Sequence, residues 1–240
     1  MDLENVSLEG LLKTMCGRFS QYHSAREIAE AFQVDTDDDL PPRFNIAPSQ
    51  TVAAIVRTPD APQRQLRWLR WGLIPSWAKD PAIAYKLINA RAETAAEKPS
   101  FRHAFKHRRC LIPSDGFYEW QRAEGSKSKK QPYYFSLKDS ALFAYAGLWE
   151  SWESPEGNIV ETCTILTTHA NDTVSPIHER MPVILNPDDY DLWLDPAIVY
   201  TDRLQALLKP YPAEATIAYP VSSKVNSPKI DSPECNQPLS

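Results

Sequence analysis

Long apolar runs, clustered cysteines and glycine-rich nucleotide loops are all missing from this chain of 240 residues. No apolar run approaches the roughly 18 to 20 residues that a membrane span requires. The first fourteen residues also lack the basic and apolar regions of a secretory signal. We therefore expect a soluble protein of a reducing compartment. The sequence has no P-loop, no dinucleotide fingerprint and no metal-ligand spacing, so we expect no cofactor and no metal.

The cysteines are few and far apart. Cys16, Cys110, Cys163 and Cys235 are separated by 94, 53 and 72 residues, without a CxxC or Cys/His cluster. Such spacing does not favour zinc or a disulfide framework. We predict four free thiols.

Positive charge is in deficit overall but is concentrated locally. The net charge is −5, which argues against a nucleic-acid partner. Residues 86–130 nevertheless hold eleven Lys or Arg against five Asp or Glu. These charges indicate either a basic face on an acidic protein or scattered solvated charges, and charge alone does not decide between the two.

The apolar pattern predicts a β-rich α+β domain. Ser24 can cap a helix over residues 24–33, and residues 51–58 and 64–71 alternate like strands. Further strands are expected at 109–114, 116–120, 131–137, 142–150, 159–168 and 214–222, with short helices at 100–105, 186–194 and 201–208, the last capped by Thr201. We predict a single domain built on a curved, mostly antiparallel β-sheet or barrel with short flanking helices. Core packing is expected for Trp68, Trp149 and Trp193, and a surface position for the chain after Asn226.

Four polar residues in apolar or aromatic surroundings are candidates for chemistry: Cys16, Asn89, Glu119 and His178. Each also has an ordinary structural explanation, as a buried thiol, a loop amide, an outward-facing acid and a turn histidine. Glu119 is the strongest candidate because it lies between Tyr118 and Trp120. Desolvation there would raise the pKa of the carboxyl group and suit it to proton transfer.

Seven ordered motifs favour a functional role for these four candidates. They are MCGRF, RFNIAPSQ, RWGLIPSWAKD, LINARAET, GFYEW, AGLWE and HERMPVIL. In this order and spacing they closely resemble the SRAP family (SOS response-associated peptidase). The resemblance implies an SRAP domain over residues 15–235, a leader over residues 1–14 and a tail over residues 236–240.

The resemblance implies that Cys16 becomes the N-terminal residue and reacts with abasic DNA. An N-terminal cysteine carries an α-amine of pKa about 7.7 to 8.0, so part of it is neutral and nucleophilic at pH 7. The amine would form a Schiff base with the aldehyde of a ring-opened abasic site, and the thiol would close a thiazolidine. By the same resemblance, Asn89 would hold the amino group or sugar, Glu119 would shuttle protons and His178 would act as a general acid.

The expected partner is single-stranded DNA that contains abasic sites. The resemblance implies phosphate contacts from Arg18, Arg91 and Arg180, and surfaces for bases or the sugar from Pro48, Trp71 and Trp120. A cationic groove with stacking platforms is also what sequence-independent binding of single strands requires. Residues 222–227 are expected to line the groove. We expect a cytoplasmic monomer without membrane contact, associated with the nucleoid if the source is bacterial.

Residues 1–14 conflict with this mechanism, because an internal Cys16 has no free amine. Either translation starts at Met15, followed by removal of that residue, or the protein cleaves the bond before Cys16 itself. Two other functions stay open. One is a thiol peptidase that acts on other proteins, and the other is a binder of single strands with no covalent step.

Overall fold

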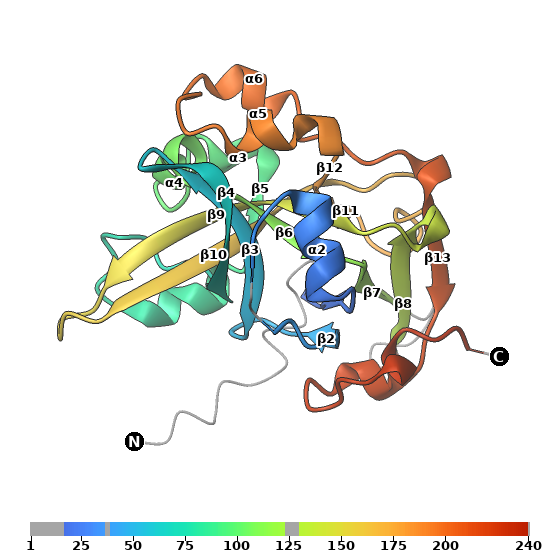
Figure 1. Ribbon diagram of the computed structural model, residues 1–240. Coiled ribbons are helices and arrows are strands. Elements are labelled where there is room, and N and C mark those ends of the chain that lie inside the picture. The colour runs from blue at the N-terminus through green and yellow to red at the C-terminus, as the bar shows by residue number, and fades with distance from the viewer. Residues whose placement is uncertain (1–16, 37–38, 123–129, 240) are drawn as a thin grey trace.

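The computed structural model describes residues 17–36, 39–122 and 130–239. Five of its strands close into a barrel, seen at the centre and left of Figure 1. They are β3 (Thr51–Thr58), β4 (Ala61–Trp71), β6 (Arg109–Ser114), β9 (Phe143–Glu153) and β10 (Ile159–His169). The pairings β3–β4, β3–β6, β6–β9 and β9–β10 are antiparallel, and the parallel pairing of β10 with β4 completes the ring.

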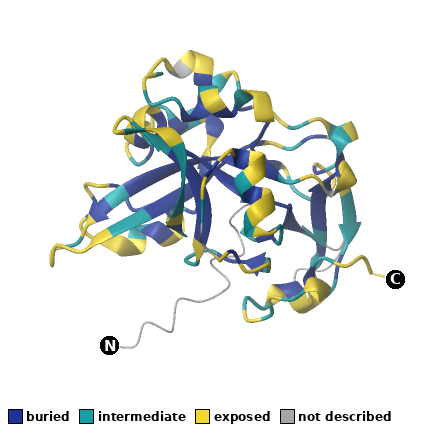
Figure 2. Cartoon of the chain, viewed as in Figure 1, coloured by how far each residue is buried: buried dark blue, intermediate teal, exposed yellow. Residues whose placement is uncertain are grey.

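Strand alternation divides the barrel residues between two apolar clusters. On β3, Ala53 and Ile55 pack with the helices, whereas Val52, Ala54 and Val56 join a second cluster that reaches the other sheet. Successive side chains of a strand point to opposite faces, which produces this division. Figure 2 shows that the barrel strands are largely buried while the helices keep an exposed side. The core therefore extends on both sides of the barrel wall.

A second, antiparallel sheet lies on the right of Figure 1. Its strand order is β13 (Thr216–Pro220), β8 (Lys130–Leu137), β7 (Gly116–Arg122), β1 (Phe19–Gln21) and β2 (Arg43–Ile46). Phe19 connects the two sheets, since its ring packs edge-on against Trp71 at 5.2 Å and Tyr145 at 5.8 Å between centroids. The short strand that follows Cys16 is thus held by the core of both sheets.

Shorter elements extend the barrel sheet or lie beside the two sheets. The strands are β5 (Asn89–Arg91), β11 (Arg180–Pro182) and β12 (Ile184–Leu185); the helices are α2 (Ala25–Phe32), α3 (Ala92–Ala95), α4 (Arg102–His107), α5 (Tyr190–Leu194) and α6 (Thr201–Gln205). Single 3-10 turns lie at Pro81–Lys86, Lys138–Ser140, Pro187–Asp189, Ala213–Ala215, Ser223–Asn226 and Pro233–Cys235. None of the helices in the described ranges is long and apolar enough to cross a membrane.

The predicted fold class, an α+β domain on a mostly antiparallel barrel, is confirmed. The Ser24 cap is also confirmed: its hydroxyl accepts from the Glu27 N–H and the Glu27 side chain accepts from the Ser24 N–H. The predicted helix at 201–208 was wrong in its bounds, because it ends at Gln205 and Tyr200 is the capping residue.

Three predictions about burial had different outcomes. Trp149 and Trp193 are buried as expected, but Trp68 is 41% exposed, because it belongs to the first part of β4, in which no residue before Leu69 is buried. The chain after Asn226 does not simply lie over the surface, since Cys235 is fully buried against Tyr118 and Val225. Cys110, Cys163 and Cys235 are free thiols as predicted. Cys16 lies outside the described residues.

Candidate functional site

The site is built around β1, which begins three residues after Cys16 in the sequence. Its partner β7 runs antiparallel, with Phe19 opposite Phe117 and Ser20 opposite Gly116. The Tyr118 N–H donates to the Arg18 carbonyl at 3.0 Å, which extends the pairing. Continuing this register by one more residue puts Glu119 opposite Gly17, the neighbour of Cys16. Glu119 is 4% exposed, as expected for a carboxyl group flanked by Tyr118 and Trp120.

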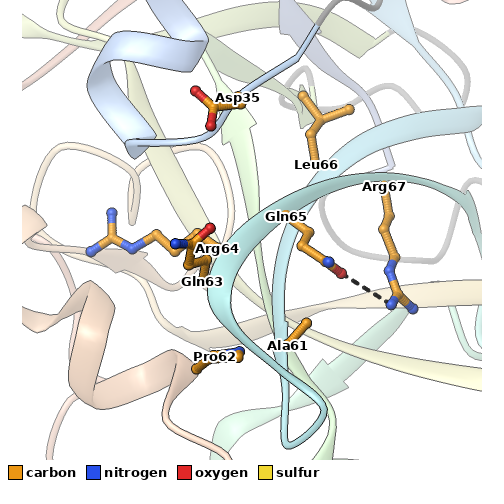
Figure 3. A pocket seen from close by; sticks show the side chains of 8 residues that line it. All are labelled: Asp35, Ala61, Pro62, Gln63, Arg64, Gln65, Leu66 and Arg67. Atoms are coloured by element: carbon orange, nitrogen blue, oxygen red, sulfur yellow. Dashed lines mark hydrogen bonds between the residues drawn. The ribbon is translucent and has the colours of Figure 1, made fainter.

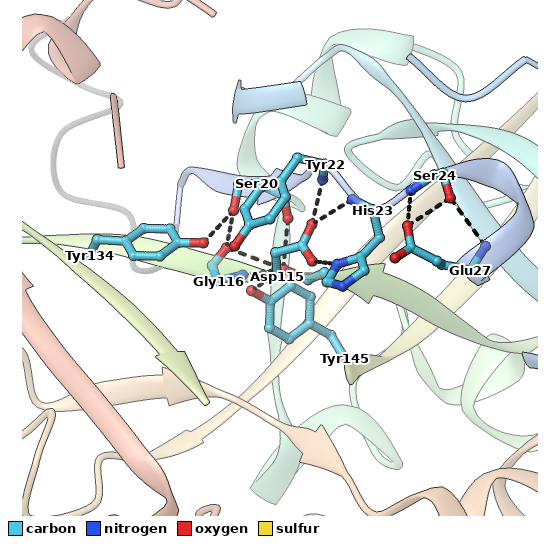
Figure 4. Close-up of polar contacts among 10 residues, drawn as sticks. Ser20, Tyr22, His23, Ser24, Glu27, Asp115, Gly116, Tyr134 and Tyr145 are labelled. Carbon is cyan, nitrogen blue, oxygen red and sulfur yellow. Dashed lines mark hydrogen bonds and ion pairs between the residues drawn. The ribbon is translucent and has the colours of Figure 1, made fainter. Parts of the chain in front are cut away.

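A buried carboxylate anchors the other end of β1. Asp115 is 2% exposed and accepts hydrogen bonds from the Tyr22 N–H, the His23 N–H and the His23 ring, as Figure 4 shows. Burial raises the pKa of Asp115, while the bonds from Tyr22 and His23 lower it, and the net direction is upward. This anchor holds the chain directly after β1 against the turn that leads into β7.

Two pairs of hydroxyl groups add side-chain contacts on either side of Asp115 in the fold. Ser20 Oγ lies 2.7 Å from the hydroxyl of Tyr134 (Figure 4), and Ser114 Oγ donates to the hydroxyl of Tyr145 at 2.8 Å. Gly116 fits between them because a Cβ there would lie 2.3 Å from Cζ of Tyr134 and 2.4 Å from the Phe135 carbonyl oxygen. The close approach of β1, β7 and β8 depends on this glycine.

Arg18 ties the strand to the loop at residues 222–227. Its guanidinium donates to Oδ1 of Asn45 at 2.9 Å and to the carbonyls of Val225 at 2.7 Å and Asn226 at 3.3 Å. Burial lowers the pKa of Arg18. The Trp120 indole N–H donates to Oδ1 of Asn226 at 2.7 Å, so the half-buried Trp120 borders the same loop. Arg18, Trp120 and the loop at residues 222–227 therefore lie together in the structure.

Asn89 is linked to β1 through the contacts of its neighbour Ile88. It is half-buried at the start of β5, which runs parallel to β10 with Asn89 opposite Ile165. The Ile88 carbonyl accepts from the indole N–H of Trp71 at 2.8 Å, and Trp71 in turn packs on Phe19. This chain of contacts connects Asn89 with β1.

The prediction that Trp71 offers a surface to a base was wrong for this conformation. Its side chain is 1% exposed and its only donor is bonded to the main chain. Trp71 therefore supports the site from behind.

His178 lies in the turn between β10 and β11. Its Nδ1 accepts from the Arg180 N–H at 3.1 Å, which leaves Nε2 as the ring nitrogen that can face a substrate. Burial lowers the pKa of His178, and the nearby cations Arg122 and Arg180 act in the same direction, against the raising effect of the Arg180 main chain and Glu179. Gln121 Nε2 donates to the Pro176 carbonyl at 3.4 Å, so the end of β7 meets this turn. His178 and Glu119 are thus carried by neighbouring segments.

The three predicted phosphate-binding arginines differ in their surroundings. Arg180 is 5% exposed and makes a bidentate ion pair with Glu93, at 2.7 and 2.8 Å, besides a bond to the Thr167 carbonyl. Direct contact of its guanidinium with a phosphate would require that pair to open. Arg91 is exposed at the end of β5, and Pro48 is half-buried in the turn between β2 and β3.

The described surface includes two concavities that bear on the site. One of about 660 Å³ is formed by Asp35 and the first part of β4 (Figure 3). Its cations are already engaged, since Arg64 bonds the Phe32 carbonyl and Asp191, and Arg67 bonds Gln65 and Glu161. The other, of about 390 Å³, contains Asn89 and Arg91 and so belongs to the candidate site.

The donor set offers no metal centre. Within the described ranges no three His, Cys, Asp or Glu side chains are arranged to hold a metal ion. The groups that the site gathers are a carboxyl, an amide, an imidazole and cations, which suit proton transfer and anion binding.

The family model for SOS response associated peptidase (SRAP) matches residues 15–228. The chain belongs to the SRAP family. Among its relatives is YoqW of Bacillus subtilis, named an abasic site processing protein, which is 50% identical over 223 residues, 92% of this chain and 98% of YoqW. HMCES of Gallus gallus, with the same functional name, is 38% identical over 204 residues, 75% of this chain and 59% of HMCES.

Solved structures agree with this membership. A crystal structure of a protein from Bacteroides thetaiotaomicron is similar with a TM-score of 0.83 and 28% identity, over 94% of this chain and 100% of that one. A protein from Bordetella bronchiseptica is similar with a TM-score of 0.74 and 30% identity, over 86% of this chain and 100% of that one.

Sequence reasoning did not single out Trp77 or Asp115. Trp77, in the loop between β4 and β5, is 59% exposed, more than any other tryptophan of the described chain. Trp77 and the buried Trp71 lie in the same motif, and the sequence does not indicate that their exposure differs. Asp115 was also missed, although an acid next to a glycine between two apolar strands is a signal of a buried turn anchor.

Proposed function

We propose that this SRAP protein processes abasic sites in single-stranded DNA by covalent capture through Cys16. The α-amine of Cys16 attacks the aldehyde of the ring-opened sugar and releases one water as the imine forms. The thiol then adds across the C=N bond, with its proton passing to nitrogen, and closes a thiazolidine ring. The step requires that the bond before Cys16 has been cut.

One observation carries this proposal: the buried Glu119 lies on β7, the strand that pairs with β1, and β1 begins three residues after Cys16 in the sequence. In the proposed reaction, this carboxyl group takes the proton of the amine and returns it to the departing water. His178, which presents Nε2, acts as general acid toward the ring oxygen of the sugar, and Asn89 holds the amino group or sugar. The functional names of YoqW and HMCES, abasic site processing proteins, support abasic sites as the target.

Residues whose side chains are exposed or half-buried supply the contact with DNA. Arg91 contacts phosphate, while Pro48, Trp120 and Trp77 offer apolar surfaces to bases or the sugar. Arg18 and Arg180, which are bonded to protein acceptors, reach phosphate only after those bonds rearrange.

The test is a denaturing gel of the protein after incubation with a single-stranded oligonucleotide that bears one abasic site. We expect a shifted band that Cys16→Ala abolishes, that Glu119→Gln slows, and that the matched thiol control Cys235→Ala retains. An undamaged oligonucleotide should give no band. If Cys16→Ala still forms the band, the nucleophile is another group. If neither the wild type nor any variant forms the shifted band but the wild type hydrolyses peptides, the protein is a peptidase.

A further inference from the structure

Glu93, an acid in the first turn of α3, holds the side chain of Arg180. Its two carboxylate oxygens accept from the two terminal nitrogens of the Arg180 guanidinium, at 2.7 and 2.8 Å. Such a bidentate pair fixes both the distance and the orientation of the two planar groups. Burial raises the pKa of Glu93, whereas hydrogen bonds and the charge of Arg180 lower it, and the net direction is downward. Glu93 is therefore ionised at neutral pH, and the pair is complete.

The Arg180 side chain is also fixed to β10. Its guanidinium donates to the Thr167 carbonyl at 2.6 Å and lies 3.4 Å from the Thr167 hydroxyl. Arg180 is 5% exposed, so a change in its position must displace packed neighbours. Three segments, α3, β10 and β11, thus meet at one guanidinium.

The main chain of Arg180 in turn holds the ring of His178. Nδ1 of His178 lies 3.1 Å from the Arg180 nitrogen and 3.2 Å from the Arg180 carbonyl oxygen. A neutral ring accepts from that N–H and carries its proton on Nε2, and a protonated ring donates to that carbonyl. The ring therefore keeps a partner in both protonation states. Since Arg180 is the first residue of β11, and strand ends are held less firmly than strand interiors, its side-chain bonds add to the support of this main chain.

We propose that Glu93 is a positioning residue for His178 and acts through Arg180. This inference rests on the proposed function, in which His178 is the general acid, and adds a residue that need not contact the reacting atoms. The ion pair holds Arg180, the Arg180 main chain holds Nδ1, and Nε2 is thereby given a fixed direction. A displacement of about 1 Å of a reacting group can cost about 100-fold in rate. Loss of the Glu93 carboxylate therefore slows the reaction without removing any group that takes part in it.

The experiment measures crosslinking of Glu93→Gln to an abasic single-stranded oligonucleotide at saturating DNA. Glu97→Gln is the control, because it removes an exposed acid four residues further along the chain. We expect the first-order rate to fall by about 10- to 100-fold for Glu93→Gln and to stay unchanged for Glu97→Gln. Affinity for an oligonucleotide with a tetrahydrofuran abasic analogue, which has no aldehyde and cannot crosslink, should not fall. Glu93→Asp, which keeps the charge but shortens the reach by one methylene, replaces Glu93→Gln if that variant does not fold.

A double-variant cycle separates positioning from a purely structural role. Glu93→Gln/His178→Gln should crosslink no more slowly than His178→Gln alone, because the effect of Glu93 passes through the imidazole. Losses that multiply in the double variant would overturn the inference. Equal rates for Glu93→Gln and the wild type would overturn it too, as would a loss confined to affinity.

Nitrogen NMR of the His178 ring gives a readout that does not depend on crosslinking. At about pH 8 the wild type should show one neutral tautomer with its proton on Nε2, assigned by its loss in His178→Gln, and Glu93→Gln should show a mixture of the two tautomers. An unchanged tautomer in Glu93→Gln sinks the inference alone, even when the wild type crosslinks. A mixture in Glu93→Gln, together with a wild type that forms no crosslink, sinks the proposed function alone.

Discussion

Replacing Asp115 by alanine should destabilise the protein by removing the anchor of β1. The carboxylate accepts from two main-chain N–H groups, of Tyr22 and His23, and from the His23 ring. A buried donor left without an acceptor costs about 1 to 3 kcal/mol. Tyr22 and His23 are only half-buried, so water can partly replace the carboxylate, and we expect a loss of about 3 kcal/mol in total.

Asp115→Asn is the matched control. Its amide oxygen can still accept from the main chain, and the neutral group avoids the desolvation that raises the pKa of Asp115. The expected loss for Asn is within about 1 kcal/mol. For a chain of this size, about 1 kcal/mol shifts Tm by about 2 to 4 °C, so Asp115→Ala should melt about 6 to 12 °C below the wild type.

Thermal unfolding followed by circular dichroism at pH 7 measures both variants. A loss below about 1 kcal/mol for Asp115→Ala would refute the reasoning, because it would mean that the two N–H groups find other acceptors. Equal large losses for Ala and Asn would also contradict it, since they would show that the negative charge, rather than the hydrogen bonds, stabilises the turn.

Two further predictions follow from the same surroundings. Gly116→Ala should lower the free energy of unfolding by about 3 kcal/mol or more, because its Cβ would meet Tyr134 and the Phe135 carbonyl. The control Gly157→Ala, whose Cβ would have no atom within 4 Å, should cost only the strain of its positive φ, about 1 kcal/mol. Equal losses for the two variants in urea unfolding would contradict this reasoning. Since burial lowers the pKa of His178, the ring is neutral at pH 7 and gains its proton only below the ordinary value of 6.5. If the imidazolium is the general acid, the ratio of crosslinking rates of wild type to His178→Gln should rise as the pH falls through the folded-state pKa, and a ratio independent of pH would exclude that role.

The barrel strands could be predicted because local alternation survives in a closed sheet. Residues 51–58 and 64–71 were expected as strands and form β3 and the larger part of β4. The helix at Ala25–Phe32 was predictable from its capping residues. The sequence does not indicate the parallel pairing of β10 with β4 that closes the ring, because that pairing joins segments about 90 residues apart.

The sequence names candidate site residues but does not indicate which of them are exposed. Trp71 and Trp77 belong to one motif, yet Trp71 faces the core and Trp77 the solvent. The sequence also does not indicate that Arg180 pairs with Glu93, which lies 87 residues away. Such contacts depend on where distant strands meet, which neither periodicity nor composition specifies.

Intact-mass spectrometry after incubation with an abasic single-stranded oligonucleotide tests the central claim most directly. Covalent capture by the amine and thiol of Cys16 predicts a species whose mass is that of the chain from Cys16 onward plus the DNA, less one water. A processed chain that begins at Cys16 and forms no adduct would contradict the account. An adduct on a chain that retains residues 1–15 would contradict it equally, because Cys16 then has no free amine to react.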